Sequence, residues 1–178
     1  MKKKLYIALM LCMTVLLVAA CGKKKEDPAK ALKDEIVKFV GTDLPGIAAE
    51  RDQAVAAFNE AMSSASDPSE VLKKVKETCV PTMESYLNKL NALTTTAPEV
   101  GELKELYRQS AQKQYDAMKM VVSAIEGENP DYLTQANTLV TEAKTALADY
   151  ETKLKEICDA NNIKITTGAA TSTATDAN

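Results

Sequence analysis

Cys21 stands directly after a segment whose order of residues would direct export and cleavage of the chain. Residues 2 to 4 are lysines, residues 5 to 18 are uncharged, and Ala19 and Ala20 are small residues next to the cysteine. This order is typical of a signal peptide that is cleaved before Cys21. The largely apolar run from residue 5 to residue 20 is shorter than the ~20 residues that a membrane-spanning helix needs, which argues against an uncleaved anchor.

The residues Val18-Ala19-Ala20-Cys21 resemble the lipobox of bacterial prolipoproteins, which usually has leucine where this chain has Val18. The resemblance implies removal of residues 1 to 20 and a covalent diacylglycerol thioether at Cys21, with further acylation such as palmitate. It also implies an extracytoplasmic protein, anchored by its lipid to the outer face or periplasmic side of the cell membrane. One acyl chain holds a protein only marginally, at ~0.8 kcal/mol per buried CH₂, so the two or three chains that the family attaches would hold it durably.

The predicted mature chain is negatively charged. Residues 1 to 20 contain three of the 22 Lys and Arg residues and none of the 25 Asp and Glu residues, so the mature chain has 19 cationic and 25 anionic side chains. Because nucleic-acid binding requires clustered cations, we expect no nucleic acid as a partner. The run Lys23-Lys24-Lys25 would lie beside the lipid, where each lysine near an anionic headgroup surface contributes ~1 kcal/mol.

The chain contains no histidine. This absence excludes Ser-His-Asp and Cys-His catalysis and the metal motifs that include histidine. Carboxylates alone bind calcium or magnesium, but the sequence has no loop of the EF-hand type. No pair of a nucleophile and a base stands out either. We therefore expect a protein that is not an enzyme and has no metal or other cofactor besides the covalent lipid at Cys21.

Two cysteines remain once Cys12 is removed with the signal peptide and Cys21 is lipidated. Cys79 and Cys158 would then be the pair available for a disulfide in an oxidising compartment. Geometry argues against this bond, because the two helices would run parallel with the cysteines ~15 Å apart along the axis, and a disulfide requires Cα atoms within ~7 Å. A different topology, or a kink at Pro81, would be needed to bring them together.

Two polar residues interrupt apolar stripes and are the candidate ligand-binding residues. Arg51 lies between Ile47 and Val55 in the stripe of one predicted helix, and Gln114 lies midway along another. A buried guanidinium requires a carboxylate and hydrogen-bonding partners, which a ligand pocket would also exploit. The alternative is an arginine at the rim of the helices, with Gln114 fixing their register.

Tyrosines supply most of the aromatic side chains of the predicted mature chain. A tyrosine at the edge of a helical core packs its ring and leaves its hydroxyl in water, and it also suits a recognition surface. We expect edge packing for most of them. The five are Tyr86, Tyr107, Tyr115, Tyr132 and Tyr150.

Helical signals run through the chain from residue 29 to residue 161. The predicted helices cover residues 29–40, 43–65, 67–92, 98–126 and 130–161. Gly41 is the predicted stop of the first helix, because glycine readily takes the left-handed conformation that ends helices. Asp67 before Pro68 is typical of an N-cap followed by proline at the first helical position. Pro81, inside the third helix, predicts a kink.

The spacing of apolar residues and the short connections predict how the helices pack. In the last helix the apolar positions repeat in steps of three and four from Leu133 to Ile157, which is a heptad seam. Short connections force neighbouring helices to run antiparallel. We therefore predict an all-α fold: an up-down four-helix bundle with a short extra N-terminal helix. The domains would be a signal peptide at 1–20, a lipidated basic tether at 21–28, the bundle at 29–165 and a disordered Thr- and Ala-rich tail at 166–178.

Two hypotheses of function remain. The first is a membrane-anchored, non-enzymatic helical bundle that binds a protein or another component of the cell envelope, since the mature part resembles small helical lipoproteins of bacteria. The second is a small-ligand carrier or sensor with a pocket near Arg51 and Gln114. An unpaired, buried Arg51 beside a cavity would favour the carrier, whereas a dry core with an exposed tyrosine-rich face would favour partner binding.

Overall fold

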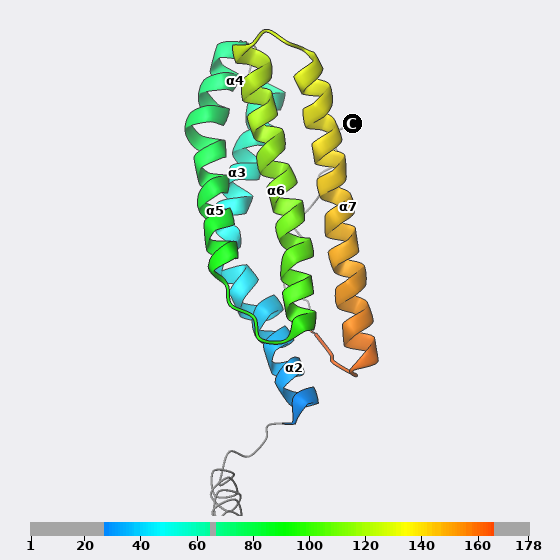
Figure 1. Ribbon diagram of the computed structural model, residues 1–178. Helices are drawn as coiled ribbons and strands as arrows, with labels where there is room; N and C mark the ends of the chain where they lie inside the picture. Colours follow the sequence, from blue (N-terminus) through cyan, green and yellow to red (C-terminus); the bar gives the residue numbers. More distant parts are fainter. Residues whose placement is uncertain (1–26, 65–66, 166–178) are drawn as a thin grey trace, which may run out of the picture.

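The structure, a computed structural model, describes residues 27–64 and 67–165 and is all-α (Figure 1). No strand occurs among these residues, so the all-α part of the prediction is confirmed. The predicted signal peptide, Cys21, nearly all of the tether and the tail at 166–178 lie outside the described residues. The elements are α2 (Pro28–Lys38), η2 (Phe39–Asp43), α3 (Leu44–Ser64), α4 (Pro68–Lys74), η3 (Val75–Cys79), α5 (Val80–Ala92), α6 (Pro98–Glu126) and α7 (Asp131–Ala160).

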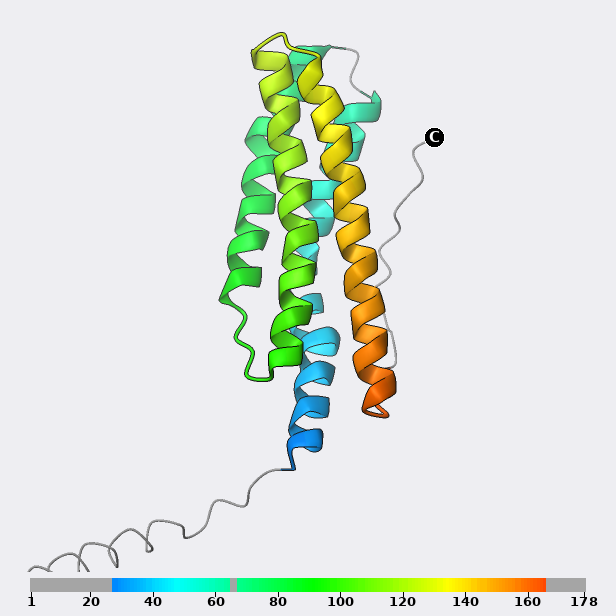
Figure 2. The same ribbon diagram turned by 45° about the vertical axis from the view of Figure 1, so that its right-hand side comes forward.

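These elements form four helical rods. The first rod joins α2, η2 and α3, the second joins α4, η3 and α5, and α6 and α7 are the third and fourth. Figures 1 and 2 show the rods side by side, with the chain reversing its direction at each connection. The α2 end of the first rod extends past the connection between α5 and α6. None of the described helices is long and apolar enough to cross a membrane.

The predicted helix end at Gly41 is wrong. The chain passes through Gly41 in the π-helical turn η2, where the Leu44 N–H donates to the Phe39 carbonyl five residues earlier. The φ of Gly41 is outside the left-handed region. Pro45 follows at once, and because its ring clashes with the carbonyl four residues back, a wider turn fits there. The predicted extra N-terminal helix is therefore continuous with the next helix.

The second rod also has a π-helical turn shortly before a proline, here Pro81. The Val80 N–H donates to the Val75 carbonyl across the π-helical turn η3, and Pro81 comes next. The disturbance that Pro81 predicted therefore takes the form of a π-helical turn on its N-terminal side. The predicted start of this rod is confirmed, because the Asp67 side chain caps the helix by accepting from the Ser69 N–H at 2.9 Å.

The core lies along the inward faces of the rods. In α7 the buried residues include Ala136, Ala143, Tyr150 and Ile157, all members of the predicted seam. Leu133, the first member, is 39% exposed near the start of the helix. After α7 the chain turns back and buries Ile163 against the same core. The spacing of apolar residues thus predicted which face of α7 is inside.

Candidate functional site

Arg51 is held by groups of the protein itself. Its guanidinium donates through Nε and Nη2 to Oδ1 of Asp52, at 3.1 and 2.7 Å, and through Nη1 to the hydroxyl of Tyr107. The Arg51 side chain is only 13% exposed, whereas that of Asp52 is 53% exposed. Arg51 Cζ also lies 5.8 Å from the centroid of the Tyr107 ring, within the range of a cation–π interaction. The carboxylate partner that a buried arginine requires is therefore its own neighbour in sequence.

Three tyrosines join Arg51 to form a polar layer in the core. The rings of Tyr107 and Tyr150 meet edge to face, with centroids 5.0 Å apart and planes at 65°. Tyr86 lies close enough to Tyr107 and Arg51 for both to act on its pKa. We call these four residues the Arg51–tyrosine layer. Since α3, α5, α6 and α7 each supply one member, the layer ties all four rods together at one level.

The electrostatics of the layer keep Tyr86 and Tyr150 neutral and Arg51 charged. Burial, together with Tyr107, raises the pKa of Tyr86 and the pKa of Tyr150 well above the ordinary value for tyrosine. Burial acts to lower the pKa of Arg51, but Tyr107, Asp52 and Tyr86 outweigh it and the net shift is upward. None of these three residues therefore titrates near neutral pH, as a general acid or base would need to do.

Three buried polar atoms make no hydrogen bond of ordinary geometry with the residues that the structure describes, although one of them, the Tyr86 hydroxyl, lies close enough to Tyr107 for a hydrogen bond between them to help raise its pKa. They are the hydroxyl oxygens of Tyr86 and Tyr150 and the amide oxygen Oε1 of Gln114. The two hydroxyls belong to the Arg51–tyrosine layer. Buried polar groups are nearly always hydrogen-bonded to protein or to ordered water. These atoms are therefore the least satisfied part of an otherwise apolar core.

The two predicted ligand-binding residues are not brought together. Gln114 follows Tyr107 by seven residues on α6, which places it ~10 Å farther along that helix than the partner of Arg51. The lining of the two most prominent hollows includes neither Arg51 nor Gln114. The predicted shared pocket thus has no counterpart in these hollows.

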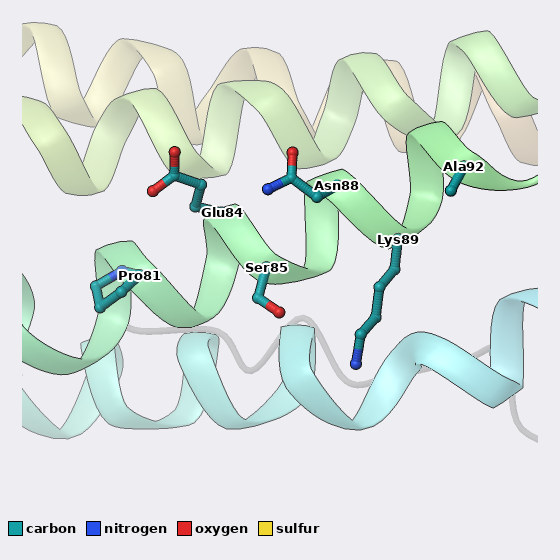
Figure 3. A pocket seen from close by; sticks show the side chains of 6 residues that line it. All are labelled: Pro81, Glu84, Ser85, Asn88, Lys89 and Ala92. Atoms are coloured by element: carbon teal, nitrogen blue, oxygen red, sulfur yellow. The ribbon is translucent and has the colours of Figure 1, made fainter.

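The larger hollow, of about 520 Å³, is a shallow trough on the outer face of α5 (Figure 3). Ser85 and Lys89 point from α5 toward α3, where both donate to the carboxylate of Glu50, at 3.1 and 2.7 Å. These bonds, that from Lys89 first, lower the pKa of Glu50. The polar groups of the trough thus fasten two helices together. The lining residues are Pro81, Glu84, Ser85, Asn88, Lys89 and Ala92.

The second hollow, of about 400 Å³, lies between α2 and the connection from α5 to α6. Glu35 of α2 accepts from the Thr96 and Ala97 N–H groups, at 2.6 and 3.0 Å, and from the Thr96 hydroxyl at 2.5 Å. Burial acts to raise the pKa of Glu35, but these hydrogen bonds outweigh it and the net shift is downward. Glu35 thus satisfies two backbone N–H groups directly before α6 and ties α2 to the connection that leads into that helix.

Cys79 and Cys158 are both buried and free in the structure. Cys79 precedes Tyr86 by seven residues on the second rod, and Cys158 follows Tyr150 by eight residues on α7. These rods run in the same direction and the tyrosines share one layer, so the cysteines lie on opposite sides of it, ~20 Å apart along the axis. Burial raises the pKa of both thiols, which reduces their reactivity.

Sequence reasoning treated the tyrosines as edge residues and missed the layer. Tyr86, Tyr107 and Tyr150 each occupy an apolar seam position of their helix, as Arg51 does. The sequence did contain a sign of the layer: in each of four helices, a residue with a polar group at its tip stands at a position of the apolar seam. Whether these four residues lie at the same height along the domain depends on how the helices are aligned with one another. The spacing of residues within one helix contains no information on that alignment.

What the fold and this site define is an all-α domain with a polar layer in its core. Within residues 27–64 and 67–165, no three or more Cys, Asp or Glu side chains are grouped as they are around a metal ion. No model of a protein family matches the chain, and no curated protein and no solved structure is significantly similar to it.

Proposed function

We propose that the protein is a membrane-anchored extracytoplasmic lipoprotein whose helical domain binds a protein or another envelope component and is not an enzyme. The packing that we propose for the domain is the up-down four-helix bundle. The anchor rests on the signal pattern before Cys21. The binding role rests on one observation above all: Arg51 is engaged by Asp52 and Tyr107 within the domain, as expected of a residue that stabilises the fold. The exposed tyrosine-rich face that would favour binding directly does not support it, because Tyr86 and Tyr150 are buried.

The proposed anchor fixes which end of the domain is near the membrane. Six residues, 22 to 27, separate Cys21 from the start of α2, and a fully extended chain of that length spans ~20 Å at most. The α2 end of the first rod would therefore stay close to the lipid headgroups. The 29 residues of α6 extend ~44 Å, so the connection between α6 and α7 would point away from the membrane. A partner approaching from outside would meet that far end first.

The anchor is tested by Cys21→Ser, with Cys12→Ser as the matched control inside the signal peptide. In cells fed labelled palmitate, we expect label in the wild type and in Cys12→Ser but none in Cys21→Ser, which should persist as a longer precursor. A Cys21→Ser protein that still carries label and fractionates with membranes as the wild type does would refute the anchor.

The partner is tested by photo-crosslinking in cells. Met62 and Leu133 are exposed apolar side chains near the far ends of α3 and α7, and partner binding commonly covers such groups. A photoreactive residue at either position should give a discrete adduct, whereas the same probe at Lys155, near the other end of α7, should not. If none of the three positions gives an adduct, the partner-binding role is wrong.

The carrier or sensor is retained as a second candidate because Gln114 Oε1 is buried without a partner among the described residues. A ligand bound near Arg51 and Gln114 would satisfy such an atom. Thermal unfolding of the wild type and of Arg51→Met against a set of carboxylates and phosphates separates the two roles. A compound that stabilises only the wild type would favour the carrier, and we expect none to do so.

A further inference from the structure

The Arg51–tyrosine layer contains buried phenol groups whose hydrogen-bonding capacity the described residues do not use fully. Each of its three phenol groups has one O–H to donate, and the guanidinium adds N–H groups. The Tyr107 hydroxyl accepts from Arg51, and a single oxygen of Asp52 accepts two further bonds from the guanidinium. The hydroxyl of Tyr150 has no hydrogen-bond partner among the described residues, and that of Tyr86 has none of ordinary geometry besides its close approach to Tyr107, although the two residues are 3 and 0% exposed.

We propose that this layer is a binding site for buried, ordered water, held by the hydroxyls of Tyr86 and Tyr150 beside Tyr107. Water both donates and accepts, so one molecule satisfies a phenol group that the protein leaves unpaired. Buried waters of this kind typically make about three hydrogen bonds to polar groups of the protein. The polar tips that four helices direct into one level provide such groups.

The charge balance of the layer selects a neutral occupant. Asp52 already neutralises Arg51, and Tyr86 and Tyr150 stay protonated because burial raises the pKa of both. A bound anion would leave a net negative charge in the core, and a bound cation would be repelled by Arg51; both are costly away from water. Water adds no charge.

The layer also reaches the surface of the domain at one edge. Asp52, which holds one side of the guanidinium, is about half exposed, and the guanidinium itself bridges Asp52 and the Tyr107 hydroxyl. Water would exchange along this edge when the Arg51 side chain moves. The proposal does not depend on the membrane anchor or on a partner.

The test uses the mature protein in detergent, with Tyr86→Phe, Tyr150→Phe and the double variant. Each change removes one oxygen and keeps the ring, so the core stays filled. The matched control is Tyr132→Phe, near the start of α7 and far from the layer. The decisive measurement is a high-resolution crystal structure, which should show water within hydrogen-bonding distance of Oη of Tyr86, Tyr150 or both.

In a crystal structure of the double variant that water should be absent. The folding equilibrium constant of the double variant, measured by urea unfolding, should fall about fivefold or more. Tyr132→Phe should change that constant less than twofold. A wild-type structure in which both hydroxyls bond directly to protein groups, or in which an anion occupies the layer, would overturn the proposal. A double variant as stable as the wild type would do the same, since an oxygen without a partner stabilises nothing.

Discussion

Arg51 on α3 donates a hydrogen bond to the hydroxyl of Tyr107 on α6, and so joins the first rod to the third. Its charge is balanced by Asp52, the next residue in the chain, at the solvent edge of the same layer. The contact therefore links helices that are not consecutive in the chain, and it does so with a neutral hydroxyl in place of a second buried charge. Breaking it should cost less than breaking a fully buried ion pair, for which 3 to 5 kcal/mol is typical.

Arg51→Met should lower the free energy of unfolding by about 1 to 3 kcal/mol, because the Tyr107 hydroxyl loses its charged donor while the aliphatic volume is largely kept. The double variant Arg51→Met/Tyr107→Phe should recover part of the loss, since neither partner is then left unpaired. Urea unfolding of the single and double variants measures both. Arg108→Met is the control, because the exposed Arg108–Glu105 pair should contribute at most about 1 kcal/mol. Strict additivity of Arg51→Met and Tyr107→Phe would contradict the contact.

Gly41→Ala should raise the free energy of unfolding by about 0.5 to 1 kcal/mol, because Gly41 is inside a helical segment and alanine restricts the unfolded chain more than glycine does. A Cβ at Gly41 would meet no other atom within 4 Å, so no clash offsets the gain. Thermal or urea unfolding measures the change. A loss of stability would restore the interpretation of Gly41 as a left-handed helix end.

Glu35 should make the stability of the domain depend on pH. Its pKa is lowered in the folded state, so the stability that it contributes is complete above the unfolded value and is lost as the pH falls through the folded value. Glu35→Gln should therefore cost about 1 to 2 kcal/mol at pH 7 and less at pH 3, where the unfolded chain binds a proton at this carboxyl more readily than the folded protein does.

Urea unfolding of the wild type and Glu35→Gln at both pH values gives the two differences. Glu156→Gln, at an exposed position of α7, is the control for a general effect of removing one negative charge. If the difference between wild type and Glu35→Gln is the same at pH 7 and pH 3, the carboxylate is not what holds the connection before α6.

Cys79 and Cys158 should be unreactive in the folded protein and should not pair with each other. Both thiols are buried, and the tyrosine layer separates them. If the chain is cleaved before Cys21 and lipidated there, as proposed above, Ellman's reagent should show almost no release from the native protein and two equivalents after unfolding in guanidinium. A mass that rises by ~2 Da on reduction would reveal a disulfide and contradict this arrangement.

The helices could be predicted from interactions between residues close together in the sequence. The packing of one helix against another could not. The start at Asp67 and Pro68 was correct because a cap involves only residues within one turn of each other. The stop at Gly41 was wrong because Phe39, Val40 and Leu44, which are buried on both sides of it, hold the helix together. The tendency of glycine to end a helix is worth a few tenths to about one kcal/mol, which is less than the burial of three apolar side chains contributes.

The site was predictable only in its parts. Arg51 and Gln114 were recognised because each interrupts an apolar stripe, a property of one helix. That Arg51 meets Tyr107, and that Glu35 reaches Thr96, depends on residues 56 and 61 positions apart. Such contacts are set by the relative height and rotation of helices, for which a single sequence contains no direct measure.

The two π-helical turns give each of the first two rods one residue more than a regular helix of the same path would hold. Elsewhere in a helix, deleting a single residue rotates everything that follows by about 100° and turns the apolar face away from the core. Within 39–43 or 75–79 the same deletion would convert the wide turn into an ordinary one and leave the faces on both sides where they are. These two short stretches are therefore the places in the rods where the length of the chain can change by one residue while every other side chain keeps its neighbours.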